Sequence, residues 1–166
     1  MDAERLIAVS LHALAGSADA PEVMVEAWQA QALAQAIGMR LAVGGPLDLR
    51  AEARELGEAG GRGCGSADHP GLHSGGIRAG RLSAVPDVKA ALTGLGELLG
   101  EVGIALVAVA CDTGEEGMYW QCIEAIDAAD ETSDRVQGML RGLRELERDG
   151  ASGGAGRWRG GGDLLS

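Results

Sequence analysis

The residues of this chain that are best suited to chemistry lie close together in a glycine-rich stretch. Cys64, His69 and His73 follow the spacing Cys-x4-His-x3-His, and Asp68 stands among them. Thiolate, imidazole and carboxylate groups are the usual zinc ligands, and the His-x3-His half has a spacing found in zinc sites. No Cys-x2-Cys half accompanies it, so a fourth ligand must come from Asp68 or from a distant residue. The pattern predicts either a zinc site or a surface loop in which these residues are incidental.

A second group of chemically interesting side chains lies on the last helix that the sequence predicts. Its carboxylates recur at helical spacing and therefore share one side of that helix: Glu124, Asp127, Glu131 and Asp134. Di-metal helical bundles combine such faces with Glu-x-x-His, a motif that this sequence lacks. We expect a solvated helix face, with a docking surface for a basic partner as the alternative.

Catalytic motifs are absent from the sequence. There is no Gly-x4-Gly-Lys phosphate loop, and the run Gly61–Gly65 neither matches Gly-x-Gly-x-x-Gly nor follows a predicted strand. The run Gly71–Gly75 carries its serine out of register for a nucleophile elbow. We therefore predict no catalytic residue and favour a non-enzymatic role, although the enzyme question stays open.

The composition bounds the fold and the partners. Among 166 residues there are 28 glycines and no phenylalanine, and aromatic residues make up 2%. Aromatic and β-branched residues are too few for a large sheet, which favours an all-α fold. A net charge of -11 argues against nucleic acid, because binding a polyanion needs a basic surface.

Three features bear on localisation. The N-terminal Met-Asp-Ala-Glu-Arg lacks the basic and apolar regions of a secretion signal. The longest apolar block, Val102–Cys111, is roughly half the length of a membrane span. Three cysteines, an odd number, do not suggest a disulfide framework. We expect a cytoplasmic protein with no membrane partner.

Hydrophobic periodicity predicts one domain over residues 1–150, built as an antiparallel bundle of four main helices plus a short one. Asp2 can cap the first helix, Asp19-Ala-Pro21 opens the second, and Pro86-Asp87 opens the fourth. A flexible Gly-rich loop is expected over 57–86 and a disordered tail over 151–166. The helices are expected over residues 2–15, 19–44, 47–58, 87–111 and 115–149.

The fourth helix carries four glycines, and the fifth is too long for its neighbour. Each interior glycine costs ~1 kcal/mol relative to alanine, a cost best tolerated where another backbone comes close. The fifth helix would span on the order of 50 Å, so its distal half, Arg135–Asp149, either overhangs or packs on another element. The glycines are Gly94, Gly96, Gly100 and Gly103.

The few aromatic residues predict a contact between distant parts of the chain. Tyr119 and Trp120 stand at the start of the last helix, and Trp28 is the other tryptophan of the helical domain. We favour a Trp28–Trp120 contact in the core. The alternative is an exposed apolar patch that serves an interface.

Four segments resemble a group of small actinobacterial proteins of the Streptomyces type that have no known activity. They are Glu26–Ile37, Gly61–Gly65, Leu92–Gly103 and Glu115–Asp127, and the resemblance covers residues 3 to 145. It implies a cytoplasmic actinobacterial protein, and it carries over no functional residue.

These observations favour a non-enzymatic helical bundle that works by protein–protein association, as a homodimer and as an adaptor or regulator. The alternative is a metal- or small-ligand-binding module in which the 57–86 loop supplies Cys64, His69 and His73. No cofactor is expected for the first interpretation, and zinc is the candidate metal for the alternative.

Overall fold

The chain folds as an all-α protein, as its composition predicts. A computed structural model describes residues 1–65 and 77–164, with side chains as far as Ala151, and no strand occurs in this part of the chain. The elements are α1 (Ala3–Ala15), α2 (Ala20–Gly44), η1 (Leu47–Leu49), α3 (Arg50–Cys64), η3 (Arg78–Arg81), α4 (Val88–Asp112) and α5 (Glu116–Leu164).

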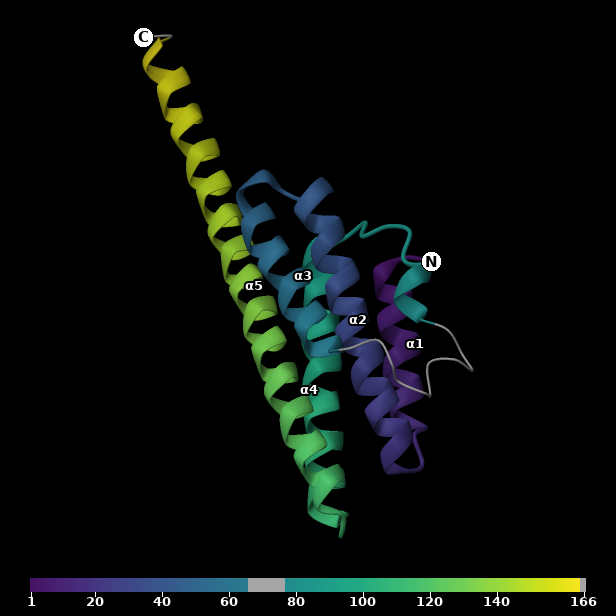
Figure 1. Cartoon of the computed structure of the whole chain (residues 1–166). Helices are drawn as coiled ribbons and strands as arrows, with labels where there is room; N and C mark the ends of the chain where they lie inside the picture. Colours follow the sequence, from purple (N-terminus) through teal and green to yellow (C-terminus); the bar gives the residue numbers. More distant parts are fainter. Residues whose placement is uncertain (66–76, 165–166) are drawn as a thin grey trace.

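The helices form an elongated bundle in which α4 and α5 make an antiparallel hairpin. Figure 1 shows α5 along one side of the bundle and α1 on the opposite side, with α2, α3 and α4 between them. The most extensive contacts join α2 to α3 and α4 to α5. The bundle is therefore built from two tightly joined helix pairs, with α1 packed against α2 and α4.

Three aspartates begin the long helices where the sequence predicts helix starts. Asp2 accepts a hydrogen bond from the Arg5 amide, Asp19 from the Glu22 amide and Asp87 from the Ala90 amide, at 2.9–3.0 Å. Each cap satisfies a backbone N–H that the helix leaves unpaired, which contributes ~1 kcal/mol. These local signals fix the helix boundaries.

Aliphatic side chains fill the core in place of aromatic rings. Leucines from α1, α2, α3 and α4 meet Val136 and Met139 of α5. The largest fully buried side chains are Leu6, Leu33, Ile37, Leu56, Leu92, Leu95, Leu98, Leu99, Leu106, Met139, Val102 and Val136.

The prediction of an irregular loop from Gly57 is wrong, because α3 continues through this glycine-rich segment to Cys64. Its glycines lie directly against the backbone of α2. A Cβ atom on Gly38 would come within 2.4 Å of the Gly57 nitrogen, and one on Gly60 within 2.6 Å of the Gln35 nitrogen. The absence of side chains lets the two helices touch backbone to backbone, so these glycines are helical contacts. We call this contact the α2–α3 seam.

Only part of the expected 57–86 loop is irregular in the described chain. Gly65 follows α3, residues 66–76 lie outside the described residues, and the short helix η3 begins at Arg78. The chain then runs beside the N-terminus, where the Ala3 amide donates to the Ala84 carbonyl at 3.0 Å and the Ser83 amide to the Met1 carbonyl at 3.0 Å.

Helix α5 is longer than predicted and its distal half packs on the bundle. Val136, Met139 and Leu140 are buried, and the space beside Gly142 is filled by Leu49 of η1. The structure also continues α5 to Leu164, whereas composition predicts disorder from Ala151. Extending an existing helix is easier than nucleating one, so the tail continues the helical path, as Figure 1 shows.

Candidate functional site

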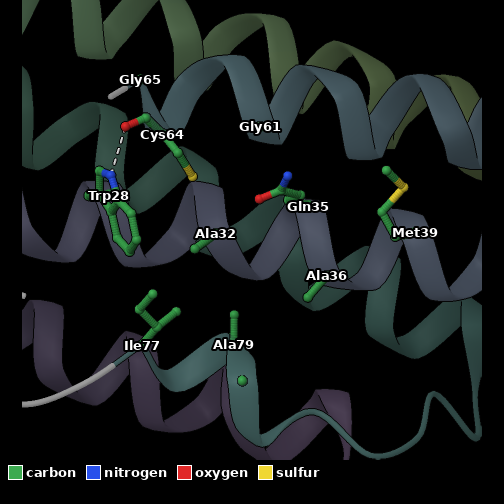
Figure 2. A pocket seen from close by; sticks show the side chains of 11 residues that line it. Trp28, Ala32, Gln35, Ala36, Met39, Gly61, Cys64, Gly65, Ile77 and Ala79 are labelled. Carbon is green, nitrogen blue, oxygen red and sulfur yellow. Dashed lines mark hydrogen bonds between the residues drawn. The ribbon is translucent and has the colours of Figure 1, made fainter. Parts of the chain in front are cut away.

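An apolar cleft lies beside Trp28. Figure 2 shows its floor on α2 and its walls on the end of α3 and on η3. Its volume is about 570 Å³, within the range of ~300–1,000 Å³ typical of small-molecule sites. We call it the Trp28 cleft; it is lined by Trp28, Ala32, Gln35, Ala36, Met39, Gly61, Cys64, Gly65, Ile77, Ala79 and Gly80.

A hydrogen bond holds the indole of Trp28 at one end of this cleft. Its Nε1 donates to the Cys64 carbonyl at 2.7 Å (Figure 2). Cys64 is the last residue of α3, where carbonyl groups lack helical partners. Gly65 follows with a φ of 60°, a left-handed conformation suited to glycine. Trp28 thus helps to end α3 and is itself oriented by doing so.

The η3 wall of the cleft is anchored to α2 by charged and amide groups. Arg78 forms a partly buried ion pair with Glu26, and the Arg78 amide donates to the Gln29 side chain at 3.1 Å. Partly buried charged hydrogen bonds are stronger than neutral ones, since water competes less for them. The wall is therefore held at a fixed distance from the floor.

Cys64 lies half-buried in the cleft, and its thiol is poorly suited to nucleophilic chemistry. Burial raises the pKa of Cys64 from 9.0 to about 11, so the thiol is protonated at neutral pH. The thiolate is the form that attacks electrophiles and binds metals. Cys111 is exposed and Cys122 is buried, and all three cysteines are free.

The predicted zinc ligands are only partly placed by the structure. Cys64 stands at the end of α3, and His69 and His73 lie outside the described residues. Within the described ranges, no three His, Cys, Asp or Glu residues gather in a way that could hold a metal ion. The zinc site stays a prediction that rests on spacing alone.

A more polar hollow of about 480 Å³ lies on the other side of Trp28 and Cys64. Beside it, the buried Thr132 hydroxyl donates to Gln31 at 2.8 Å, which links α5 to α2. Arg62 donates to Glu131 at 2.5 Å between two exposed side chains. Glu131 belongs to the carboxylate face of α5, whose members are all exposed, so this face is in contact with water as expected.

The α4–α5 hairpin carries an exposed apolar surface near its tip. Ile104 is 66% exposed and Val107 48% on α4, and Trp120 is 56% exposed on α5. The predicted core contact between Trp28 and Trp120 is therefore wrong. Trp120 instead stacks edge-on against Tyr119, with ring centroids 5.4 Å apart.

Helix α4 is more apolar than its burial requires. In the described chain it is the one helix long and apolar enough to cross a membrane by length and composition, with a mean hydropathy of 1.8 and 28% of that window buried. Core helices of water-soluble proteins pass the same test when they are mostly buried. Here much of the apolar length faces outward.

Two glycines of α4 have no partner within the described chain. A Cβ atom on Gly100 or Gly103 would meet nothing within 4 Å. By contrast, one on Gly94 would lie 3.3 Å from Ile7, so that glycine serves a contact with α1. The open glycines and the exposed Ile104 and Val107 together form a surface that we call the α4 strip.

The sequence singles out Trp28 and Cys64 separately but does not predict that the two residues line one cleft. The available signal was the alanine-rich stretch around Trp28, since small residues on the following turns leave space beside a large ring. Met39 and Ile77, which line the cleft, carry no such signal.

Comparison with known proteins gives a family and no activity. No curated protein and no solved structure matches the chain. Residues 1–142, which include every helix that forms the cleft, the whole of α4 and the first part of α5, match a family of unknown function, DUF6099. The resemblance to a family without known activity is thereby confirmed, and its actinobacterial origin stays a prediction. The chain belongs to the DUF6099 family.

Proposed function

We propose that this protein is non-enzymatic and works by self-association, with the α4 strip of one copy packed against that of a second. The observation that carries the proposal is the exposure of Ile104 and Val107 on a helix whose open side bears Gly100 and Gly103. Glu97 and Glu101 lie beside Ile104 and border this surface. An adaptor or regulatory role follows if the dimer presents its remaining surface to other proteins.

Helical geometry extends this surface from α4 onto α5. A Cβ atom on Gly96 would lie 3.2 Å from the Gln137 side chain, so these two residues share one side of the hairpin. Val107 lies about three helical turns after Gly96 and therefore faces the same side of α4. Tyr119 lies about five turns before Gln137 and therefore faces the same side of α5. Val107 and Tyr119 therefore belong to one surface.

The size of this surface suits a stable homodimer. Helix α4 has 25 residues, which at ~1.5 Å each gives about 38 Å, and two adjacent helices are about 20 Å wide. The product is about 750 Å² per copy, close to the ~800 Å² per partner of a standard interface. The outward glycines would let two α4 helices approach closely at the centre.

The charge distribution favours an antiparallel pairing. Asp112, Glu115 and Glu116 make the hairpin tip acidic. If two α4 helices cross near Gly100 and Gly103, the tips lie about 30 Å apart, beyond the ~10 Å Debye length at 0.1 M salt. In this pairing the twofold axis is perpendicular to α4, so the α5 helices of the two copies also face each other. Like charges such as the Asp130 carboxylates of the two copies then lie close together at the rim of the interface. Association should therefore tighten as salt rises.

Light scattering after size exclusion tests the proposal with a matched pair of variants. Val107→Asp puts a carboxylate on the strip, whereas Val43→Asp makes the same change at a residue that is 79% exposed on α2. We expect a dimer for the wild type and for Val43→Asp, and a monomer for Val107→Asp, because the interface would bury two unpaired charges.

A wild-type monomer at high micromolar concentration and 0.5 M salt would overturn the proposal. Flotation of that monomer with uncharged phosphatidylcholine vesicles, lost in Val107→Asp, would instead assign the strip to a membrane surface. We favour the second copy because the opposite side of α4 is buried in the bundle core and the hairpin tip carries no basic residue.

A further inference from the structure

We propose that the Trp28 cleft binds an uncharged, predominantly apolar small molecule with a flat ring system that stacks along the indole. This site is separate from the α4 strip and does not depend on self-association. The observation behind it is a hollow of about 570 Å³ whose floor and two walls come from α2, α3 and η3.

The shape of the cleft comes from an alternation of small and large residues. The cleft is deep because its floor and its α3 wall carry small residues, namely Ala32, Ala36 and Gly61. Figure 2 shows the larger side chains of Trp28 and Met39, both on α2, at the two ends of the cleft. Ile77 is 51% exposed and Met39 46% exposed, so both hold apolar area in contact with water. A bound ring would cover that area and gain ~25 cal/mol for each Å² removed from water.

The charge of the lining selects an uncharged occupant. The described lining contains no Asp, Glu, Lys, Arg or His side chain. A charged ligand would lose water there without gaining a counter-charge. Gln35 supplies the only side-chain amide of the described lining, and its donor and acceptor can orient a polar substituent on the ligand.

The walls are fixed before any ligand arrives. The Trp28–Cys64 hydrogen bond sets the indole and the end of α3, and the Arg78–Glu26 pair sets η3 against α2. The residues that follow η3, Ser83 and Ala84, form backbone hydrogen bonds with the N-terminal segment. Binding therefore needs little reordering of protein, which is the condition under which apolar contact area yields affinity.

The test uses two dyes that differ by one charged group. N-phenyl-1-naphthylamine is uncharged, and 8-anilino-1-naphthalenesulfonate is the same ring system with a sulfonate. We expect fluorescence titration of the full-length protein to show saturable, one-to-one binding of the uncharged dye, with at least about tenfold weaker binding of the sulfonate.

Variants then place the dye. Ala36→Trp fills the cleft and should weaken binding of the uncharged dye at least about tenfold. Ala51→Trp makes the same change at an exposed position of α3 outside the cleft and should leave binding unchanged. Met39→Glu adds a carboxylate at a cleft residue that is already 46% exposed, so it provides a second test if Ala36→Trp fails to fold by circular dichroism.

Three results would overturn the assignment. One is the absence of saturable binding, and another is equal affinity for the two dyes. The third is binding that survives Ala36→Trp and Met39→Glu but disappears in Val107→Asp, which would place the dye on the α4 strip. Because Val107→Asp leaves the cleft intact, a monomer that still binds the dye would support the cleft while testing self-association separately.

Discussion

Substitution of glycine by alanine should lower the stability of the protein at Gly38, which lies in the α2–α3 seam, and raise it at Gly138 of α5, which lies outside the seam. In Gly38→Ala the new methyl group would lie 2.4 Å from the Gly57 nitrogen and 2.8 Å from the Ala53 carbonyl oxygen. Both are backbone atoms, so α2 and α3 must separate. In Gly138→Ala the methyl group would meet only the flexible Arg141 guanidinium, at the ordinary distance of 3.8 Å.

The magnitudes follow from two opposing terms. Alanine is favoured over glycine inside a helix by ~1 kcal/mol at both positions. Overpacking at Gly38 costs on the order of 3 kcal/mol, because no side chain can turn aside. We therefore expect Gly38→Ala to lose about 2 kcal/mol of unfolding free energy, which lowers Tm by about 6 °C, and Gly138→Ala to gain up to ~1 kcal/mol.

Urea unfolding followed by circular dichroism measures both variants, at one protein concentration so that self-association contributes equally. If Gly38→Ala unfolds at the wild-type urea concentration, the two backbones are not in contact and the account of the seam fails. Equal destabilisation by Gly138→Ala would show that helix propensity has been misjudged.

Three further outcomes are expected. Leu140→Asp should unfold the monomer and not merely dissociate a dimer, because Leu140 is 6% exposed and an unpaired buried carboxylate costs several kcal/mol; a folded monomer by circular dichroism would contradict this. In a Cys111→Ser background, alkylation of Cys64 should titrate near pH 11, and stability should fall between pH 9 and 11 because the unfolded thiol ionises at the lower value; a midpoint at 9 would refute the burial argument. Untagged protein purified in metal-free buffer should hold no stoichiometric zinc by mass spectrometry, because within the described ranges no three ligand side chains gather to hold a metal ion; about one zinc per chain, lost in Cys64→Ser, would establish the Cys64–His69–His73 site instead.

Local signals in the sequence predicted most of the fold. Helix starts at Asp2, Asp19 and Asp87 depend on the residues of one turn, and the apolar stripes depend on a 3.6-residue period. Both are visible without knowing what the helix packs against. The class of the fold and the start of each long helix therefore followed from the residues themselves.

The errors concern contacts between distant segments. Glycine usually interrupts a helix, but here the glycine-rich stretch is helical where it packs against α2, with Gly38, about twenty residues earlier in the chain, opposite Gly57. Trp120 is apolar and stands at helical spacing, but whether its face meets the core depends on how α4 and α5 are rotated. The Trp28 cleft likewise requires α3 and η3 to be placed beside α2, which no local pattern specifies.

The α2–α3 seam also constrains how the sequence can change over evolutionary time. Where two side chains meet in a core, a larger residue on one side can be accommodated by a smaller one on the other. At Gly38 and Gly60 the opposing atoms are backbone nitrogen and oxygen, which every amino acid shares. A smaller side chain on the opposite helix would not create space for a larger residue at Gly38 or Gly60, because backbone atoms fill that space. A substitution at either glycine therefore cannot be compensated by a second substitution in the seam. A selection for suppressors of Gly38→Ala should therefore return reversions or changes that stabilise the bundle elsewhere, and none at the residues that face it.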